Sequence, residues 1–583
     1  MAIEVVIPML GITIERGKIT RWLKAEGDFV KKGEPIFEVE TEKLVTEVES
    51  PGTGILKRIL VSEDIEVPVL TVVAIITEKG EEIPEKYRKV KPEIPSLTEA
   101  KDSQQPRTRS LPPASVGRPE CFDIAILGAG SGGYVASIRA AQMGAQVLLI
   151  EKDELGGTCL NRGCIPTKSY LSDIKTYKRV KSSDLFLNGS KVSIDLKKMV
   201  FRKNQVVETA KKGISLLLES QKITVLKGVG TFSSSKKIRV SSHGKGQVYE
   251  AQNIIIATGS QVASLPGIKI DGNRILSSDD VVNLKNVPED ILIIGGGVIG
   301  VEFATIFNWL GARVTILEML PQIVSSEDEE VIRGLKLLLE RQGVKILTNA
   351  KVLKAFPKKA KTEIIAKREG KEERLSGEKL LIAVGRVPNT AGLNLDKMGI
   401  KMEGKFIKVN SRMETNINGI YAIGDAIGKT MLAHAASAEG IVAVENILGK
   451  VREIDYQKIP SCIYTFPEVA SVGLKESEAR EKGYEIQVGK FPYLNNGKAL
   501  AMGEAEGFVK IVAEKELGRI LGVHILGEHA TDLIGECLLA LNVEASIEDL
   551  GEVIKGHPTL SEALTEAALD CQGLSIHKLK KSN

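Results

Sequence analysis

Two glycine-rich turns, each set between an apolar strand and a helical stretch, constrain the fold of this chain most. The first turn, at 128–133, follows the apolar run 122–127, and the second, at 295–300, follows the run 291–294. Glycines at such turns let the backbone approach a pyrophosphate, which the positive end of the following helix stabilises. The repeated pattern predicts two nucleotide-binding domains, each built on a parallel sheet.

A carboxylate follows each turn at a position from which it can bind a ribose. Glu151 closes the next strand, 18 residues beyond Gly133, and Glu318 stands at a strand end in the second unit. A carboxylate at Glu318 accepts a hydrogen bond from a ribose 2′-hydroxyl and repels a 2′-phosphate. Because no arginine follows at 319–322, the sequence favours NAD over NADP. The glycines expected to approach the two nucleotides are Gly128, Gly130, Gly133, Gly295, Gly297 and Gly300.

The stretch 1–79 has a different character, with short alternating strands, glycine-rich turns and a weak internal repeat. Aligning 17–37 with 54–74, a shift of 37 positions, matches five residue pairs. Two similar halves of short strands predict a small all-β sandwich of quasi-two-fold symmetry. Lys43 lies between the two copies, where a hairpin should join them, and we expect it at an exposed tip.

Residues 80–119 hold seven of the 21 prolines, many charges and few large apolar side chains. Such a composition cannot bury enough surface to fold, and it predicts a linker. A coil of this length has an r.m.s. reach of about 35 Å and a contour of about 140 Å.

Cys159 and Cys164 follow the first glycine turn. In a regular helix, residues five apart are separated by about 7.5 Å of rise and face different ways. A disulfide needs closer α-carbons, so a reactive pair requires a distorted segment, which Gly163 and Pro166 permit. The alternative interpretation is two buried thiols in a helix.

With the run 156–168, the sequence resembles the flavin-dependent pyridine nucleotide–disulfide oxidoreductases, and among them the enzymes that oxidise dihydrolipoamide. The match covers essentially all of 120–575. The resemblance implies that Cys159 is the interchange thiol that meets the substrate. It also implies that Cys164 lies against the flavin and forms a charge-transfer contact when reduced.

The same resemblance assigns further residues to FAD and NAD. Lys168 would pair with Glu302 near the reactive nitrogen of the flavin. The other FAD positions implied are Gly230, Thr258, Gly259, Ser260, Asp425, Met431, Leu432, Ala433 and His434. Val352 and Gly385 are expected to contact the second nucleotide, NAD.

His557 is the candidate proton acceptor. A lone histidine is more often structural, but this one, with Glu562, resembles the His–Glu dyad of the family, in which the acid orients the imidazole and stabilises its cation. Pro558 suits the first position of a helix, so we expect a helix to open there. In the family the histidine reaches the disulfide of the partner subunit, which implies a homodimer. Lys555 stands nearby, where the family commonly has a second histidine.

The surroundings of Lys43 resemble the lipoyl domains of 2-oxoacid dehydrogenase complexes. The resembling runs are 26–35 and 48–52, on either side of the lysine. In that family an acidic residue beside the lysine marks the lipoylated position, whereas biotin carriers have methionines there; here the neighbour is Glu42. The resemblance implies a lipoyl group on Lys43. We hypothesise that the linker lets this arm visit the catalytic site of its own dimer and of neighbouring subunits.

Composition excludes several other classes. A balance of 79 basic against 75 acidic residues gives no reason to expect nucleic acid or a membrane surface. The first residues lack a signal-peptide pattern, no apolar run approaches membrane-spanning length, and six cysteines are too few for a secreted disulfide framework. We therefore expect a cytoplasmic protein. No metal is expected, because the remaining histidines and cysteines lack metal-ligand spacing.

The expected fold is α/β, with two Rossmann-like FAD- and NAD-binding domains and an α+β dimerisation domain, preceded by the all-β lipoyl sandwich. The expected boundaries are 1–79 for the lipoyl domain, 80–119 for the linker, 120–265 and 391–460 for the FAD-binding domain, 266–390 for the NAD-binding domain and 461–583 for the dimerisation domain.

The resemblance implies oxidation of protein-bound dihydrolipoamide by NAD⁺ through a redox disulfide and FAD. The chain would serve a 2-oxoacid or acetoin dehydrogenase complex, beside lipoylated acyltransferase and decarboxylase components. One alternative is another flavin disulfide reductase, which reduces glutathione or a different small disulfide with NADPH. The other is a lipoyl carrier or assembly module with a vestigial reductase.

Overall fold

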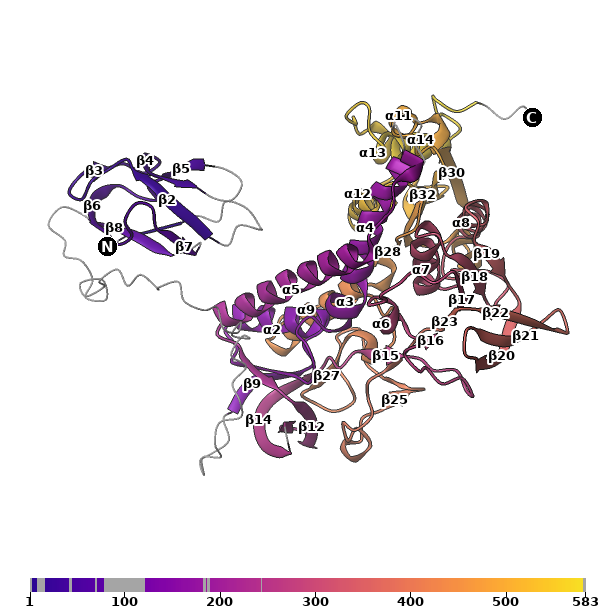
Figure 1. Cartoon of the computed structure of the whole chain (residues 1–583), viewed down its shortest axis with the longest axis horizontal. Coiled ribbons are helices and arrows are strands. Elements are labelled where there is room, and N and C mark those ends of the chain that lie inside the picture. The colour runs from indigo at the N-terminus through magenta and orange to yellow at the C-terminus, as the bar shows by residue number, and fades with distance from the viewer. Residues whose placement is uncertain are drawn as a thin grey trace. The chain divides into compact units, whose positions relative to one another are not determined.

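The computed structural model describes residues 3–7, 16–40, 45–68, 71–77, 121–181, 185, 189–242 and 244–579. Lys43 and the predicted linker at 80–119 lie outside the described residues. The chain divides into two compact units, Met1–Gln104 and Gln105–Asn583 (Figure 1). Within the described residues, no helix is long and apolar enough to cross a bilayer. The cytoplasmic location stays a prediction.

The N-terminal unit is a sandwich of two four-stranded sheets. The first sheet has the order β1 (Ile3–Val6), β8 (Val72–Thr77), β6 (Gly54–Ile59) and β3 (Phe29–Val30). The second has the order β5 (Val45–Glu49), β4 (Pro35–Glu40), β2 (Arg16–Trp22) and β7 (Glu66–Pro68). β4 and β8 begin 37 positions apart, as do β3 and β7, and each pair occupies equivalent places in the two sheets. The predicted sandwich of two similar halves is therefore confirmed.

The larger unit contains two parallel sheets with the same plan. The first has the parallel order β11 (Thr224–Lys227), β10 (Val147–Glu151), β9 (Cys121–Leu127), β14 (Lys245–Ile256) and β27 (Ile420–Ala422). The second has the parallel order β19 (Lys345–Leu347), β18 (Arg313–Leu317), β17 (Asp290–Ile294), β23 (Lys379–Ile382) and β16 (Ile275–Leu276). The central strands are buried along almost their whole length, which is typical of parallel sheets covered on both faces. The predicted pair of Rossmann-like domains is confirmed.

Antiparallel strands and helices complete both domains. The antiparallel strands are β12 (Val229–Ser234) and β13 (Lys237–Ser242) in the first domain, and β20 (Ala350–Pro357), β21 (Thr362–Arg368) and β22 (Lys371–Gly377) in the second. The short strands that pair with each other are β15 (Ser260–Val262) with β24 (Arg386–Pro388), and β25 (Met402–Glu403) with β26 (Phe406–Ile407). The helices that follow the glycine turns are α2 (Ser131–Gln142) and α7 (Val298–Trp309). Other helices of these domains are α6 (Ser278–Val281), α8 (Glu329–Arg341) and α9 (Ala433–Ile447).

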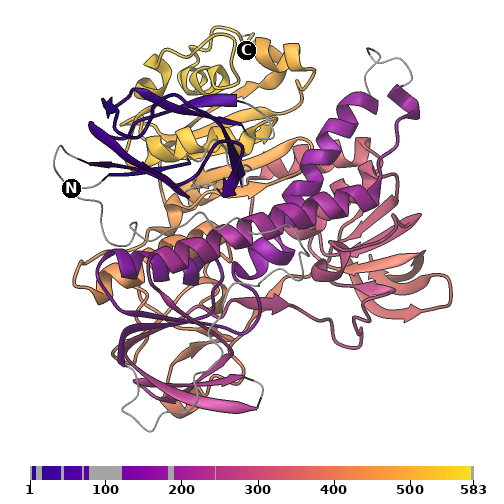
Figure 2. The same cartoon turned by 60° about the vertical axis from the view of Figure 1, so that its left-hand side comes forward.

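Two long helices lie between β10 and β11 in the sequence. α4 (Cys164–Lys181) follows the short α3 (Gly157–Arg162), and α5 (Leu196–Ser220) runs beside α4 (Figures 1 and 2). Asp195 caps α5, because its carboxylate accepts from the backbone N–H groups of Lys197 and Lys198. Cys159 and Cys164 therefore lie where this pair of helices begins, Cys159 in α3 and Cys164 at the start of α4.

The C-terminal domain is a five-stranded antiparallel sheet covered by helices. The strand order is β28 (Ser461–Ile463), β29 (Glu468–Gly473), β32 (Ile520–Gly527), β31 (Phe508–Glu514) and β30 (Ile486–Pro492). The helices are α10 (Glu476–Glu481), α11 (Gly497–Met502), α12 (Ala530–Asn542), α13 (Ile547–Glu552) and α14 (Glu562–Asp570).

One predicted helix start is wrong. We expected a helix to open at Pro558, but α14 begins at Glu562, four residues later. The reason is that the Glu562 carboxylate accepts the backbone N–H of Thr559, at 2.8 Å, and so holds this residue in a turn outside the helix. A proline in a turn and a proline at a helix start have the same sequence signal.

Candidate active site

The helical segment that carries the two cysteines is broken between them. α3 ends at Arg162, Gly163 has φ −123° and ψ −112°, and α4 starts at Cys164. A Cβ on Gly163 would lie 3.0 Å from the carbonyl oxygen of Thr158, so a larger residue would strain the break. The predicted distortion is confirmed, because a continuous helix could not bring thiols five residues apart together.

The two thiols are free and share a hydrogen bond, and this contact makes them chemically different. The hydrogen bond from Cys159 lowers the pKa of Cys164 to about 7, against burial and with help from the charge of Lys168. The same hydrogen bond, together with burial, raises the pKa of Cys159. In the reduced pair, therefore, Cys164 is the thiolate and Cys159 the protonated thiol.

Lys168, one turn after Cys164 on α4, forms an ion pair with Glu302 on α7. The ammonium lies 2.7 Å from one carboxylate oxygen and 2.8 Å from the other. Glu302 is 5% exposed and also accepts the backbone N–H of Tyr464 at 3.1 Å. The ammonium stands 4.3 Å from the centre of the Tyr464 ring, within range of a cation–π contact. This set of contacts joins the cysteine helix to the second nucleotide domain.

The first glycine turn has the space that a pyrophosphate needs. Gly128, at φ +106°, and Gly133 allow strand and helix to approach so closely that a Cβ on either would clash with a backbone oxygen. A Cβ on Gly130 would meet nothing within 4 Å, so the turn is open on that side. Glu151 accepts the backbone N–H of Ala129 at 2.6 Å, which fixes its carboxylate beside the turn.

Polar groups from four separate segments also meet in the first nucleotide-binding domain. Arg386 donates to the Ser260 hydroxyl at 2.7 Å and to the Thr158 hydroxyl at 3.4 Å, and Ser260 donates to Asp425. Within the described residues, the buried hydroxyl of Thr258 has no hydrogen-bond partner. An orphaned buried hydroxyl beside this cluster fits a polar cofactor such as FAD, which would supply the missing partner.

The start of α9 carries the other residues that the sequence assigned to FAD. Leu432 caps the helix and Ala433 begins it, while Met431 has the left-handed φ of +51°. Thr430, just before them, has a second buried hydroxyl without a partner among the described residues, and His434 contacts the carbonyl of Pro460 at 2.8 Å. The positive end of α9 and this hydroxyl suit a ring that gains negative charge on reduction, which again fits FAD.

The second glycine turn repeats the geometry of the first. Gly295 has φ +108°, a Cβ on Gly300 would lie 1.9 Å from the Gly295 oxygen, and Gly297 faces open space. Glu318 accepts the backbone N–H of Gly296 at 2.6 Å, as Glu151 does in the first turn. The residues therefore fit a second dinucleotide.

The other predicted nucleotide contacts lie in strands or in the turns beside them. Gly230 is in β12 and Val352 in β20. Gly259, with φ +67°, and Gly385, with φ +100°, belong to the turns that follow β14 and β23. Their contacts with a bound nucleotide stay predictions.

His557 and Glu562 form the predicted pair within one chain. The Nδ1 atom of His557 lies 2.8 Å from a carboxylate oxygen of Glu562. Although partial burial opposes ionisation, hydrogen bonds from Thr559 and His557 hold the pKa of Glu562 below its usual value. The His557 side chain is 79% exposed, so its outer nitrogen is free to serve a group from outside this chain.

Sequence reasoning missed three residues that complete the site. They are Arg386, Tyr464 and Glu439. Glu439 is 1% exposed and accepts the backbone N–H of Gly424 at 2.6 Å, which holds the turn that carries Asp425. Arg386 follows the predicted Gly385 directly in the sequence, and this adjacency was the one local signal for Arg386. Neither Tyr464 nor Glu439 has a local signal, because their partners lie elsewhere in the sequence.

Comparison with known proteins assigns three stretches. Residues 122–440 match the family described as pyridine nucleotide-disulphide oxidoreductase, 459–568 match its dimerisation domain, and 3–76 match the family described as biotin-requiring enzyme. A dihydrolipoyl dehydrogenase of Bacillus subtilis is 41% identical over 469 residues, which cover 78% of this chain and 99% of that protein. A mitochondrial dihydrolipoyl dehydrogenase of Pisum sativum is 43% identical over 465 residues, which cover 78% and 92%. The crystal structure of LpdA from Mycobacterium tuberculosis aligns with a TM-score of 0.72 at 27% identity, covering 76% of this chain and 98% of that one.

Proposed function

This chain belongs to the pyridine nucleotide-disulphide oxidoreductase family, and we propose that it oxidises protein-bound dihydrolipoamide with NAD⁺. The observation that carries the proposal is the unequal ionisation of the cysteine pair. A pKa of about 7 for Cys164 makes it a good leaving thiolate, whereas Cys159 stays protonated after it has reacted. Thiol–disulfide exchange with a dithiol substrate needs this division of roles.

The exchange transfers two electrons from the substrate to the cysteines. A substrate thiolate attacks the Cys159 sulfur of the oxidised pair, an S–S bond to the substrate forms, and the Cys159–Cys164 bond breaks to leave the Cys164 thiolate. The second substrate sulfur then attacks the first, which closes the dithiolane ring and releases Cys159. One substrate proton goes to His557, and the other goes to Cys159 as it leaves.

His557 acts as the proton acceptor because Glu562 orients its imidazole and stabilises the cation. Its exposure in a single chain supports a position at the partner subunit's cysteines, and residues 459–568 match a dimerisation domain. The proposed enzyme is therefore a homodimer whose two sites each take residues from both subunits.

The proposed cofactors are FAD and NAD. Gly128, Gly130 and Gly133 would approach the FAD pyrophosphate, and Glu318 would bind the NAD ribose. When bound, FAD supplies the redox relay between the cysteine pair and NAD⁺. Lys168 and Glu302 hold opposite charges at a fixed place beside Cys164, and so set the electrostatic field in which the thiolate forms.

We also propose that the N-terminal domain carries a lipoyl group on Lys43, whose reduced form is the substrate of the enzyme. Residues 3–76 match a family of cofactor-bearing domains, and Glu42 beside Lys43 favours lipoyl over biotin. A flexible tether gives effective concentrations on the order of millimolar. The proposed partners are the lipoylated acyltransferase and the decarboxylase of a 2-oxoacid or acetoin dehydrogenase complex.

Steady-state assays with the purified full-length chain test this function. We expect NAD⁺ reduction by dihydrolipoamide, a preference for NAD⁺ over NADP⁺, and loss of this activity in Cys159→Ser. Turnover of glutathione disulfide with NADPH at a higher kcat/KM would instead support the other reductase. A purified protein without bound flavin and without turnover would support the carrier module.

A further inference from the structure

The segment just before His557 is held by side chains rather than by its backbone. Within the described part of the chain, no backbone–backbone hydrogen bond involves residues 554–558. The side chains of the segment point to different sides: Ile554 is 97% exposed, whereas Lys555 is 9% exposed. A long charged side chain that turns inward from an otherwise exposed segment needs a specific partner.

That partner is Glu536 on α12. The Lys555 ammonium forms an ion pair with its carboxylate. α12 is a firm base for this contact, because Ile534, Cys537 and Ala540 are buried against the sheet of the C-terminal domain. Lys555 therefore ties a segment without backbone hydrogen bonds to a packed helix.

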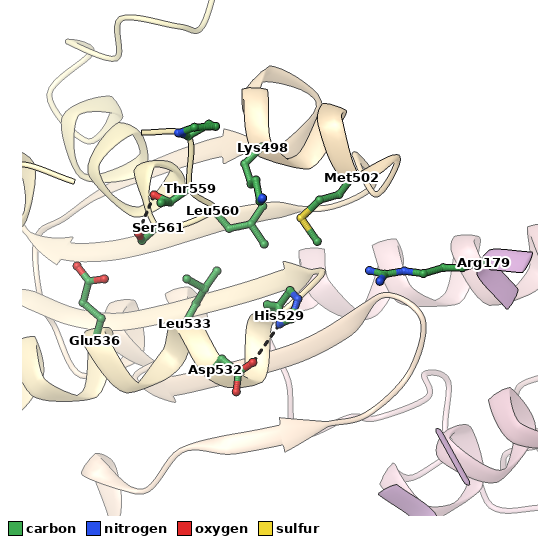
Figure 3. A pocket seen from close by; sticks show the side chains of 11 residues that line it. Arg179, Lys498, Met502, His529, Asp532, Leu533, Glu536, Thr559, Leu560 and Ser561 are labelled. Atoms are coloured by element: carbon green, nitrogen blue, oxygen red, sulfur yellow. Dashed lines mark hydrogen bonds and ion pairs between the residues drawn. The ribbon is translucent and has the colours of Figure 1, made fainter. Parts of the chain in front are cut away.

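A cavity lies beside this ion pair, and Glu536 is one of its lining residues. This cavity, of about 970 Å³, opens between α12 and the turn that follows His557 (Figure 3). Glu536 lines it from α12, and its carboxylate points toward the turn that carries Thr559 and Ser561. The apolar packing of α12 with this turn comes from the buried Leu560, after His557, so the ion pair is the contact with α12 from the segment before His557.

A second tie lies on the other side of His557. Glu562 contacts His557 and accepts the backbone N–H of Thr559, each at 2.8 Å, and the Thr559 hydroxyl donates to the carbonyl of Gly556 at 2.8 Å. This tie sets the orientation of the imidazole relative to its own turn. It does not itself contact α12. On this side of His557 the buried Leu560 packs in the same hydrophobic cluster as α12, and Lys555 adds an ion pair to α12 from the segment before His557.

We propose that Lys555 is a positioning residue for the proton acceptor His557. The inference rests on the proposed function, in which His557 must reach a dithiol at the partner subunit's cysteines. With the ion pair intact, the segment before His557 is fixed to α12, and the imidazole has a defined position. Without the ammonium, the Glu536 carboxylate, which is partly exposed, turns to water and the segment before His557 loses its anchor.

Variants at this pair test the proposal in the full-length enzyme. Lys555→Met removes the charge at nearly constant length, Glu536→Gln neutralises the partner, and Lys555→Arg keeps the cation. The exchanged double variant, Lys555→Glu with Glu536→Lys, restores a pair of opposite charges. Lys578→Met is the matched control, because Lys578 binds Asp570 at 2.6 Å in the same domain.

Two activities of each variant are compared. The oxidation of dihydrolipoamide by NAD⁺ needs His557, whereas the reduction of ferricyanide by NADH bypasses the dithiol. We expect Lys555→Met and Glu536→Gln to lower kcat/KM for dihydrolipoamide on the order of 10–100-fold, since small displacements of catalytic groups have effects of this size. Ferricyanide reduction stays within about twofold, Lys555→Arg and the exchanged variant recover most of the loss, and Lys578→Met lowers neither activity.

Each contrary outcome overturns a defined part of the account. Dihydrolipoamide oxidation within twofold of the parent in both Lys555→Met and Glu536→Gln would overturn the positioning role. An equal loss in both assays would also overturn it, because it would indicate general destabilisation. If the parent enzyme reduces ferricyanide but fails with dihydrolipoamide, the proposed function fails instead.

Discussion

Replacing Cys159 by alanine should make the Cys164 thiol much harder to ionise. The pKa of Cys164 is about 7, against a reference value of 9.0, and its first cause is the hydrogen bond from Cys159. The contact with Cys159 therefore stabilises the thiolate form of Cys164 relative to its protonated form. One hydrogen bond to a charged acceptor contributes about 1.5–3 kcal/mol, so the loss of this donor should have a measurable effect.

The other contributions to the pKa of Cys164 decide in which direction it moves in the Cys159→Ala variant. In the variant, burial still opposes the thiolate and the charge of Lys168 still favours it, so the pKa of Cys164 rises toward that of a free thiol. The thiolate fraction of Cys164 at pH 7 should therefore fall. Cys159→Ser is the matched control, because its hydroxyl keeps a hydrogen-bond donor at the same place.

The assay follows thiolate absorbance of the reduced protein between about pH 5 and about pH 10. Subtracting the titration of a double variant, Cys159→Ala with Cys164→Ser, removes the contribution of the other cysteines. We expect the titration midpoint of Cys164 to be higher in Cys159→Ala than in the parent. In Cys159→Ser we expect it to stay near that of the parent. Equal midpoints for alanine and parent would refute this expectation.

Three other substitutions have defined outcomes. His557→Ala should lower dihydrolipoamide turnover by about 10²–10⁴, the usual effect of a general base; steady-state activity within twofold of the parent would overturn this role. Lys168→Met leaves the buried Glu302 carboxylate without its cation and should lower the free energy of unfolding by about 2 kcal/mol, measured by urea denaturation. Glu439→Leu removes the acceptor for the Gly424 N–H and should increase FAD release during gel filtration, whereas Glu439→Gln keeps an acceptor and should retain FAD.

Local signals in the sequence predicted the elements of the nucleotide-binding domains. The glycine turns at 128–133 and 295–300 are recognisable because a clash or a left-handed φ excludes other residues at several of their positions. The sandwich was predictable because its repeat has a constant offset. A distorted segment followed from the cysteine spacing on the condition that the two thiols form a reactive pair, and Gly163 and Pro166 permitted it.

Contacts between residues far apart in the sequence could not be predicted from local sequence patterns. Lys168 and Glu302 are 134 residues apart, and only a resemblance to a family paired them. Nothing near Lys555 in the sequence indicates Glu536, because α12 reaches that place through the packing of the sheet. Pro558 misled for a different reason: it lies in a turn before the helix, where the carboxylate of Glu562 accepts the Thr559 N–H.

The central claim is that dithiol oxidation occurs where the cysteines of one subunit meet His557 of the other, and mixed dimers test it most directly. Cys159→Ser and His557→Ala protomers are each inactive as homodimers. Unfolding and refolding them together yields hybrids with one complete site, and random pairing of a symmetric dimer predicts about a quarter of the parent's activity. A mixture that stays as inactive as the separate variants, although hybrids are present by native mass measurement, would contradict the claim.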